Sequence, residues 1–251
     1  MSELHPATRG FEAASVYERG RPDYPAAAVA RIVERLELRP GRTVLDLAAG
    51  TGKLTRLLVP SGANVIAVEP LREMRTELEL HVPGVLALAG TAERIPLMDG
   101  YVDAVTVASA FHWFDVESAL REIRRVLAPG GGLAMIWNAR DERNPFQRAL
   151  SEIIGPLRGD TPQRTLRDWR ALLAESELFE RPERLLFEHE QLVDEDGLVA
   201  RVLSVSFVGT LPRGARADVE ERVRALARAA EQPIRLTYMT ELYVGFAAPA
   251  T

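Results

Sequence analysis

Two glycines stand where an apolar segment turns into a predicted helix, in Thr43–Lys53 (TVLDLAAGTGK). Gly50 and Gly52 have no Cβ and can adopt positive φ, so the backbone can turn sharply and a ligand can lie close against it. A helix that begins at Lys53 would present unpaired amides at this turn, and such amides suit an anionic group such as a carboxylate. Asp46, just before the turn, is well placed to meet an ammonium group. The segment therefore predicts a site for the two charged groups of an amino acid.

A second acid ends the next apolar run, Ala63–Pro70 (ANVIAVEP), at Glu69. The two oxygens of a carboxylate can accept hydrogen bonds from both hydroxyls of a ribose. A glycine turn and an acid of this kind also occur in dinucleotide-binding dehydrogenases. Their glycines are spaced G-x-G-x-x-G, but the third position here is Thr55, and their fingerprint does not require Asp46. The pattern therefore favours a ligand that joins an amino acid to a nucleoside, with a nicotinamide dinucleotide as the alternative.

The composition is typical of one α/β domain without a marked charge bias. The chain has 251 residues, of which 47% are hydrophobic and 27% charged, so it can bury a full core. Its net charge is -5, and its 31 basic residues are interspersed with 36 acidic ones. Nothing in this pattern predicts binding to nucleic acid or to a membrane surface.

The chain contains no cysteine, which excludes disulfides, thiolate zinc sites and cysteine nucleophiles. Met1–Gly10 lacks the apolar core of a signal peptide, and no later segment approaches the length of an apolar membrane span. We expect a cytoplasmic protein.

The segments that must position these residues alternate between strand and helix. After a short polar start, residues 11–17 predict one or two helical turns, and prolines predict an extended stretch at 18–25. Apolar residues at helical spacing then predict a covering helix at 26–38. The elements that follow are strand 43–48, helix 53–59, strand 63–69, helix 71–81, strands 85–90 and 102–109, helix 116–127, a turn at 128–132 and strand 132–138. This alternation predicts a parallel sheet with crossover helices.

Beyond Asn138 the regular alternation stops. Helices are predicted at 146–157, 166–175, 197–208 and 217–230, and a strand at 184–192. The closing run 234–246 is rich in β-forming residues and predicts the last strand.

Several separate segments resemble the class I S-adenosylmethionine-dependent methyltransferases, in the branch of small-molecule, trans-aconitate-type and type 11 enzymes. Their order and spacing cover about the first 140 residues of the chain. The segments are Tyr17–Pro25 (YERGRPDYP), Asp46–Gly52 (DLAAGTG), Val68–Pro70 (VEP), Gly90–Leu97 (GTAERIPL), Ala110–Phe114 (AFHWF) and Arg125–Gly131 (RVLAPGG).

The resemblance implies an α/β fold: a Rossmann-like, doubly wound sheet of seven strands with a helical insertion in the C-terminal part. The last strand, which would be 234–246, runs antiparallel. We expect one methyltransferase domain over 1–251, with an N-terminal arm (1–25), a cofactor-binding core (26–140), and substrate-covering elements with the final strands (141–251). In this family such insertions roof the acceptor pocket, which would suit the apolar helix Leu198–Phe207. Its periodicity fits a core helix or a dimer interface equally well.

The same resemblance implies S-adenosylmethionine as cofactor and S-adenosylhomocysteine as product. It places Asp46, Gly50 and Gly52 at the methionine end, Glu69 at the ribose, and Ala92 with Glu93 at the adenine. The expected cofactor-binding set is completed by Ala48, Pro70 and Ser109. The family often has glycine where this chain has Ala48, and we expect a slightly tighter turn that still binds the cofactor.

Methyl transfer from a sulfonium mainly requires that the acceptor be aligned and water excluded. His112, directly after a predicted strand, is the candidate general base. Set between Phe111, Trp113 and Phe114, it could instead be the polar edge of an aromatic wall that orients a ligand. Trp113 and Phe114 would then form an apolar floor for the acceptor, or pack in the core.

Further candidates for acceptor binding lie on either side of the predicted core. Tyr17, Arg21 and Tyr24 lie on the arm, where they could close over the cofactor or remain on the surface. Asn138 and Arg140 follow the strand at 132–138 and would reach the pocket mouth. The acidic pair Asp141–Glu142 has no second acidic set, so we expect no metal.

The sequence thus predicts a methyltransferase that uses S-adenosylmethionine to methylate a small-molecule acceptor, at the oxygen of a carboxylate or hydroxyl. Carbon or nitrogen methylation of a natural-product intermediate is one alternative. A nicotinamide-dependent oxidoreductase and a non-catalytic adenosyl-binding protein are two others. We expect neither nucleic acid nor a membrane as partner, and a monomer or homodimer.

Overall fold

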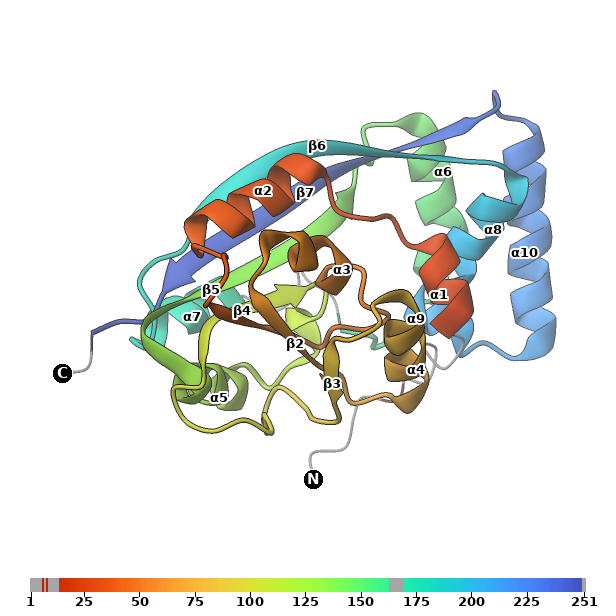
Figure 1. Cartoon of the computed structure of the whole chain (residues 1–251). Helices are drawn as coiled ribbons and strands as arrows, with labels where there is room; N and C mark the ends of the chain where they lie inside the picture. Colours follow the sequence, from red (N-terminus) through yellow and green to blue (C-terminus); the bar gives the residue numbers. More distant parts are fainter. Residues whose placement is uncertain (1–5, 7, 9–13, 163–168, 250–251) are drawn as a thin grey trace. The chain divides into compact units, whose positions relative to one another are not determined.

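The computed structural model describes residues 6, 8, 14–162 and 169–249, and the chain forms two compact units (Figure 1). Unit 1 comprises Met1–Asp23, Asn138–Thr161 and Glu188–Met239. Unit 2 comprises Tyr24–Trp137, Pro162–Phe187 and Thr240–Thr251. Parts of two predicted helical segments, 11–13 and 166–168, lie outside the described residues. None of the helices in the described ranges is long and apolar enough to span a membrane.

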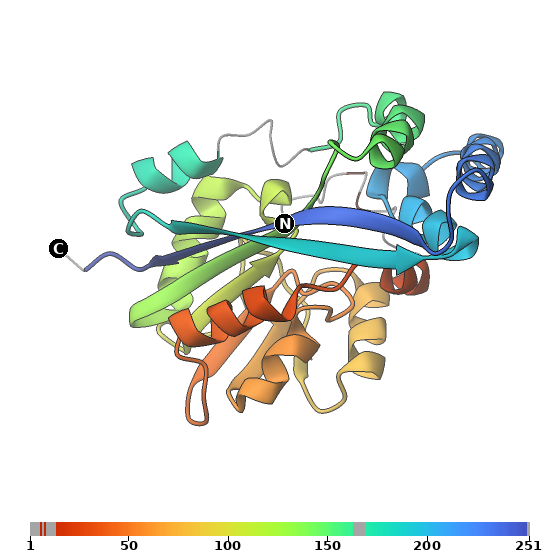
Figure 2. The same ribbon diagram turned by 90° about the horizontal axis from the view of Figure 1, so that it is seen from above.

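Seven strands form one sheet in the order β3-β2-β1-β4-β5-β7-β6. Strands β1 to β5 pair in parallel, and the arrows in Figures 1 and 2 show β7 running opposite to β5 and β6. The predicted fold class, with its antiparallel last strand, is confirmed. The strands are β1 (Thr43–Leu47), β2 (Asn64–Val68), β3 (Leu86–Leu88), β4 (Val102–Ala108), β5 (Leu127–Arg140), β6 (Glu183–Val193) and β7 (Ile234–Phe246).

Helices cover both faces of the sheet in unit 2, because successive side chains of a strand point to opposite faces. On β1, Val44 packs in a core cluster with α2 and α3, whereas Leu45 packs in another with α5 and α7. Figure 2 shows these helices on the two sides of the strands. The helices of this unit are α2 (Ala26–Arg35), α3 (Thr55–Leu58), α4 (Arg72–His81), α5 (Val116–Val126) and α7 (Trp169–Glu175), with short 3-10 turns η2 (Val59–Ser61) and η3 (Phe111–Trp113).

The predicted turn at 128–132 is wrong in one respect, because these residues belong to β5. Val102 pairs with Leu127, and Ala104 pairs with Gly132, so four residues of β5 lie opposite a single residue of β4. The segment APGG is therefore a bulge inside a long strand. Proline and glycine interrupt regular structure in a turn and in a bulge alike. Only the pairing of β5 with β4 distinguishes the two.

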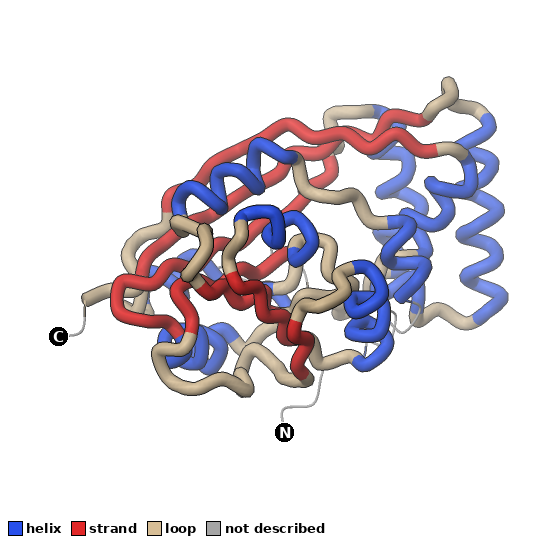
Figure 3. The backbone as a smooth tube through the Cα atoms, viewed as in Figure 1, coloured by secondary structure: helices blue, strands red, loops and turns tan. Residues whose placement is uncertain are grey.

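Unit 1 has its own core, built from helices α6, α8, α9 and α10 and from parts of β6 and β7. Its helices, drawn in blue in Figure 3, are α1 (Ala14–Gly20), α6 (Pro145–Ile154), α8 (Glu195–Leu203), α9 (Ser206–Gly209) and α10 (Arg213–Arg228), with the 3-10 turn η4 (Gly155–Leu157). The predicted helix at 197–208 is two helices, since Ser204 ends α8 and its hydroxyl donates to the carbonyl of Arg201.

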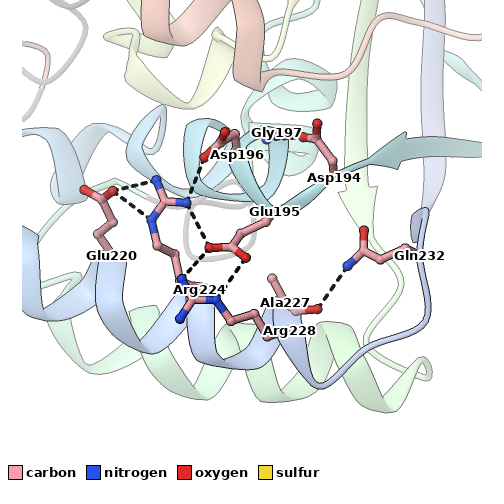
Figure 4. A network of polar contacts seen from close by, with 9 residues as sticks. All are labelled: Asp194, Glu195, Asp196, Gly197, Glu220, Arg224, Ala227, Arg228 and Gln232. Atoms are coloured by element: carbon pink, nitrogen blue, oxygen red, sulfur yellow. Dashed lines mark hydrogen bonds and ion pairs between the residues drawn. The ribbon is translucent and has the colours of Figure 1, made fainter.

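A network of charged side chains joins the start of α8 to α10 (Figure 4). The guanidinium of Arg224 binds Glu195 at 3.0 Å, Asp196 at 2.7 Å and Glu220 at 2.9 Å, and Arg228 also binds Glu195. Single exposed ion pairs contribute little, but a network of this kind fixes the relative position of two helices. It therefore helps to place α8, which carries Arg201.

The predicted extended stretch at 18–25 is only partly extended, because α1 continues to Gly20. A Cβ on Gly20 would lie 2.2 Å from the carbonyl oxygen of Ala200, so α1 packs backbone to backbone against α8. Such close approach is available only to glycine. The segment 14–20 therefore packs closely against α8 within unit 1.

Candidate cofactor and acceptor site

The turn after β1 has the backbone conformation that its glycines predict. Ala48, Gly50 and Gly52 have φ values of 55°, 58° and 84°, all in the left-handed region. That region costs an L-residue with a side chain roughly 1–2 kcal/mol, and the family resemblance implies a glycine at the position of Ala48. The alanine is accommodated at the expense of local strain.

The two glycines are needed for different reasons. A Cβ on Gly52 would lie 3.0 Å from atoms of Leu78 and Val82, so this position is required for packing against α4 and the turn after it. A Cβ on Gly50 would meet nothing within 4 Å. Open space therefore lies over the backbone of Gly50, and a ligand can occupy it.

The helix after this turn is shorter than predicted. The expected helix 53–59 is a single α-turn at Thr55–Leu58, followed by a 3-10 turn that contains Pro60. Because a helix dipole grows with aligned peptide units, one turn contributes little to anion binding. Any anion held here would depend on the individual amides of the turn.

Asp46 is fully buried, and two hydroxyls donate to its carboxylate. Thr55 Oγ1 lies 2.6 Å from Oδ2, and Thr106 Oγ1, on the adjacent strand β4, lies 3.0 Å from Oδ1. Burial raises the pKa of Asp46 to about 6, although these hydrogen bonds oppose the rise. In this geometry Asp46 holds the turn against β4 instead of facing an open surface. Thr55, which stands at the third glycine position of the dinucleotide fingerprint, thus helps to hold the Asp46 carboxylate.

Glu69 ends β2 and fastens the glycine turn from the other side. Its Oε2 accepts from the amide of Gly50 at 3.0 Å, and its Oε1 accepts from the amide of Leu71 at 2.9 Å. Arg75, on α4, donates to the carbonyls of Glu69 and Pro70 at 2.7 and 2.9 Å. Burial raises the pKa of Glu69 to about 7, against the effect of these amides and of Arg75. The predicted ribose-binding carboxylate therefore lies directly beside the open backbone of Gly50.

The predicted adenine-side residues lie at the start of α5. Ala92 is buried, and Glu93 Oε1 accepts from the amide of Asp115 at 3.0 Å. Asp115 is itself the N-cap of α5, since its Oδ1 accepts from the amide of Ser118 at 3.1 Å. The segment is thus anchored to the helix that follows the aromatic turn.

Ser109 and Tyr24, predicted from distant segments, are brought together. The hydroxyl oxygens of the two side chains lie 2.9 Å apart. Ser109 has a φ of 55°, and its amide donates to the carbonyl of Ile136 at 2.8 Å. The end of β4 is therefore sharply turned and tied to β5, immediately before the aromatic segment.

The aromatic segment 111–114 has an inner and an outer pair. Phe111 and Phe114 are buried with ring centroids 5.4 Å apart, and Phe111 lies 5.7 Å from the buried ring of Trp169. His112 and Trp113 are half-buried, with ring centroids 5.4 Å apart. Phe114 thus has the environment of a core residue, whereas His112 and Trp113 have the partial exposure that contact with a ligand requires.

Four other predicted residues, Tyr17, Arg21, Asn138 and Arg140, belong to unit 1. The guanidinium of Arg21 lies 5.1 Å from the ring centroid of Tyr17 and donates to the carbonyl of Ser204 at 2.9 Å. Asn138 Nδ2 donates to the carbonyl of Asp23 at 2.9 Å. Arg140 is the last residue of β5 and lines a small pocket together with Arg201 and Tyr238.

Sequence reasoning missed several of these residues. Thr106 and Arg75 act on Asp46 and Glu69 from other elements, and only the strand register and the position of α4 reveal them. Arg201 lies inside an apolar helical stretch, where an isolated arginine is a usable signal, because a charge on an apolar face must find a partner.

The fold and the glycine turn with its two acids define a Rossmann-like α/β enzyme of the methyltransferase type. Residues 45–135 match the family model described as a methyltransferase domain. An uncharacterized methyltransferase of Mycobacterium tuberculosis is 43% identical over 233 residues, 91% of each chain. An uncharacterized methyltransferase-like protein of Schizosaccharomyces pombe is 33% identical over 240 residues, 93% of each chain.

Solved structures agree with this assignment. A protein from Anaeromyxobacter dehalogenans, assigned as a type II methyltransferase, has a TM-score of 0.66 and 25% identity, covering 92% of this chain and 99% of its own. A SAM-dependent methyltransferase from Aquifex aeolicus shares the fold at a TM-score of 0.53 and 18% identity, with 93% and 98% covered. The chain belongs to the class I S-adenosylmethionine-dependent methyltransferase family, and it is a methyltransferase. The predicted family and enzyme class are confirmed.

The different roles of the two glycines lead to a first prediction. Gly50→Ala should reduce the affinity for S-adenosylhomocysteine at least tenfold, while stability falls by only about 1–2 kcal/mol from backbone strain. Gly52→Ala should lose roughly 2–3 kcal/mol of stability, because its Cβ also presses on Leu78 and Val82. Urea unfolding and calorimetry separate the two effects. Wild-type affinity in Gly50→Ala would show that the open space is not used by the ligand.

The raised pKa of Glu69 leads to a second prediction. The folded protein holds this proton more tightly than the unfolded chain, whose value is near 4.5. The stabilisation is therefore complete at acid pH and is lost as pH rises from about 4.5 to about 7, amounting to roughly 3 kcal/mol. Glu69→Gln should make this part of the stability profile less steep, leaving the contribution of Asp46, as measured by urea unfolding between pH 4.5 and 8. The exposed Glu79→Gln is the control, and an unchanged slope in Glu69→Gln would contradict the assignment.

Proposed function

We propose that this methyltransferase binds S-adenosylmethionine at the turn between β1 and α3 and methylates a small-molecule acceptor, at the oxygen of a carboxylate or hydroxyl. The observation that carries the cofactor assignment is the position of Glu69, whose carboxylate lies beside open backbone at Gly50. When bound, the cofactor supplies a methyl group already activated on a sulfonium.

The described residues fit this cofactor. Glu69 would accept hydrogen bonds from the ribose hydroxyls, which is possible because each carboxylate oxygen has a lone pair beyond the one used by a backbone amide. The methionine end would lie over Gly50. Asp46 would act through Thr55 and the turn, as a positioning residue, since it is fully buried. Ala92 and Glu93 would line the adenine side.

The comparisons disfavour the other classes considered. The relatives are named methyltransferases, and the third glycine of the dinucleotide fingerprint is replaced by Thr55, which is engaged with Asp46. A nicotinamide-dependent oxidoreductase and a non-catalytic binding protein have no observation in their favour. Among the remaining acceptor atoms, carbon and nitrogen are the alternatives to oxygen.

Isothermal calorimetry of the full chain with S-adenosylmethionine and S-adenosylhomocysteine tests the cofactor assignment. We expect micromolar affinity for both, and at least a tenfold loss in Glu69→Gln, because an amide accepts through only one oxygen. NADH and NADPH serve as controls that should not bind. Binding of the nicotinamide dinucleotides in place of the adenosyl pair would contradict the proposal.

His112 is the candidate base, because it is half-buried next to Trp113 and follows the end of β4. If it removes a proton, His112→Ala should lower turnover about 100-fold and leave cofactor affinity within a factor of two. A panel of hydroxy acids and phenols, with labelled methyl donor, supplies the assay. A rate that falls on acidification in the wild type and becomes independent of pH in the variant is the expected signature. An unchanged pH profile would make His112 an orienting residue.

A further inference from the structure

Residues 91–94 form a tight turn within unit 2. The amide of Arg94 donates to the carbonyl of Thr91 at 3.2 Å, so Ala92 and Glu93 are the two central residues of the turn. Among the described residues, no acceptor is paired with the backbone amide of either one. Because Ala92 has no polar side-chain atom, it can recognise a base only through its backbone. The conformation of the turn therefore decides what it can bind.

One arginine side chain on α5 binds the segment that follows this turn. Arg125 makes five hydrogen bonds, which equals the number of N–H donors in a guanidinium. Its Nε and Nη2 donate to the carboxylate of Glu122 at 2.7 and 2.8 Å. The other three bonds run to the carbonyls of Ile95 at 3.0 Å and Leu97 at 2.8 Å, and to the carboxylate of Asp99 at 2.8 Å. The fork geometry of the guanidinium thus fixes this segment against the helix.

Glu122 binds the same segment through a second backbone group. Its Oε2 accepts from the amide of Ile95 at 2.9 Å, so one ion pair of α5 holds both the amide and the carbonyl of this residue. The hydrogen bond from Arg125 lowers the pKa of Glu122, which keeps the carboxylate ionised. The two side chains are only 30% and 21% exposed, and charge-assisted hydrogen bonds with this degree of burial are stronger than those of an open surface pair.

The turn is also held at its other end. The carboxylate of Glu93 accepts from the amide of Asp115, at the start of α5, at 3.0 Å. A Cβ on Gly90 would lie 2.7 Å from Cδ of Pro96, so the loop closes on itself at its base. A loop that is held in one conformation before binding loses little entropy when a ligand arrives. The contacts with α5 therefore preorganise the turn.

We propose that Arg125 and Glu122 are positioning residues for adenine recognition, which hold the turn at 91–94 in its binding conformation through the backbone of Ile95. Neither side chain contacts the ligand. This role rests on the proposed function, which assigns the two central residues of the turn to the adenine side. A turn released from α5 would still lie near the base but would no longer distinguish a 6-amino purine from a 6-oxo purine.

The exchange of adenine for hypoxanthine reverses the hydrogen-bonding pattern along one edge of the base. In adenine, N1 accepts and the 6-amino group donates, whereas in hypoxanthine N1–H donates and O6 accepts. A site arranged for the first pattern leaves its own polar groups unpaired when it meets the second. The ratio of the affinities for the two bases therefore reports the geometry of the turn, whereas total affinity also reports contacts with the ribose and the amino acid.

Calorimetry of the full chain with S-adenosylhomocysteine and S-inosylhomocysteine measures this ratio. We expect the wild type to bind the adenosyl ligand at least tenfold more tightly than the inosyl ligand. Arg125→Lys keeps the charge but loses the fork, and should reduce the ratio at least fivefold. Glu122→Gln keeps an oxygen for the amide of Ile95 but loses the ion pair, and should reduce the ratio at least twofold. Urea unfolding identifies the variants that are folded under the assay conditions, and Glu122→Gln supplies the test if Arg125→Lys does not fold.

Two further variants separate positioning from a general loss of stability. Arg121→Lys, in an exposed ion pair on the same helix, should leave both affinities unchanged. Glu69→Gln should weaken both ligands by the same factor and keep the ratio, because the ribose is common to them. A wild type that binds both ligands equally, or an unchanged ratio in folded Arg125→Lys and Glu122→Gln, would overturn the positioning role and leave the cofactor assignment intact. If the wild type binds neither ligand, the proposed function fails and the positioning role fails with it.

Discussion

The carboxylate of Glu69 is the constraint on which the geometry of the candidate cofactor site depends. One of its oxygens receives the amide of Gly50 and the other receives the amide of Leu71, so a single side chain joins the glycine turn after β1 to the turn after β2. A backbone hydrogen bond from the amide of Ala49 to the carbonyl of Val68, at 3.2 Å, also joins the two strand ends. The buried acid adds two side-chain hydrogen bonds to this connection, and desolvation raises its pKa to about 7.

The fold was predictable wherever residue type and periodicity agree. The last strand, 234–246, was predicted to the residue, because a long run of β-branched and aromatic residues has no helical period. The bulge at 128–131 and the break of the helix at Ser204 were missed. Both depend on pairing or capping partners elsewhere in the chain, and local sequence only indicates that regular structure is interrupted.

The two candidate sites differed in predictability for the same physical reason. The cofactor residues from Asp46 to Glu69 occupy one short stretch, so strand, turn and strand place them together by chain connectivity alone. Local sequence could not show that Gly52 is required for packing whereas Gly50 faces open space, because Leu78 and Val82 come from another element. The small pocket lined by Arg140, Arg201 and Tyr238 combines residues of β5, α6, α8 and β7, and no local pattern connects them.

Burial causes its largest pKa shifts at two acids in unit 2 and at an arginine in unit 1. In unit 2, burial raises the pKa values of Asp46 and Glu69, and the charge of Asp46 adds to the rise at Glu69. In unit 1, burial and like charges lower the pKa of Arg140. A protein selected for stability alone would replace such groups by apolar residues. In unit 2 the two acids are retained in spite of this, and each holds the glycine turn through hydrogen bonds, Glu69 through the amide of Gly50 and Asp46 through Thr55.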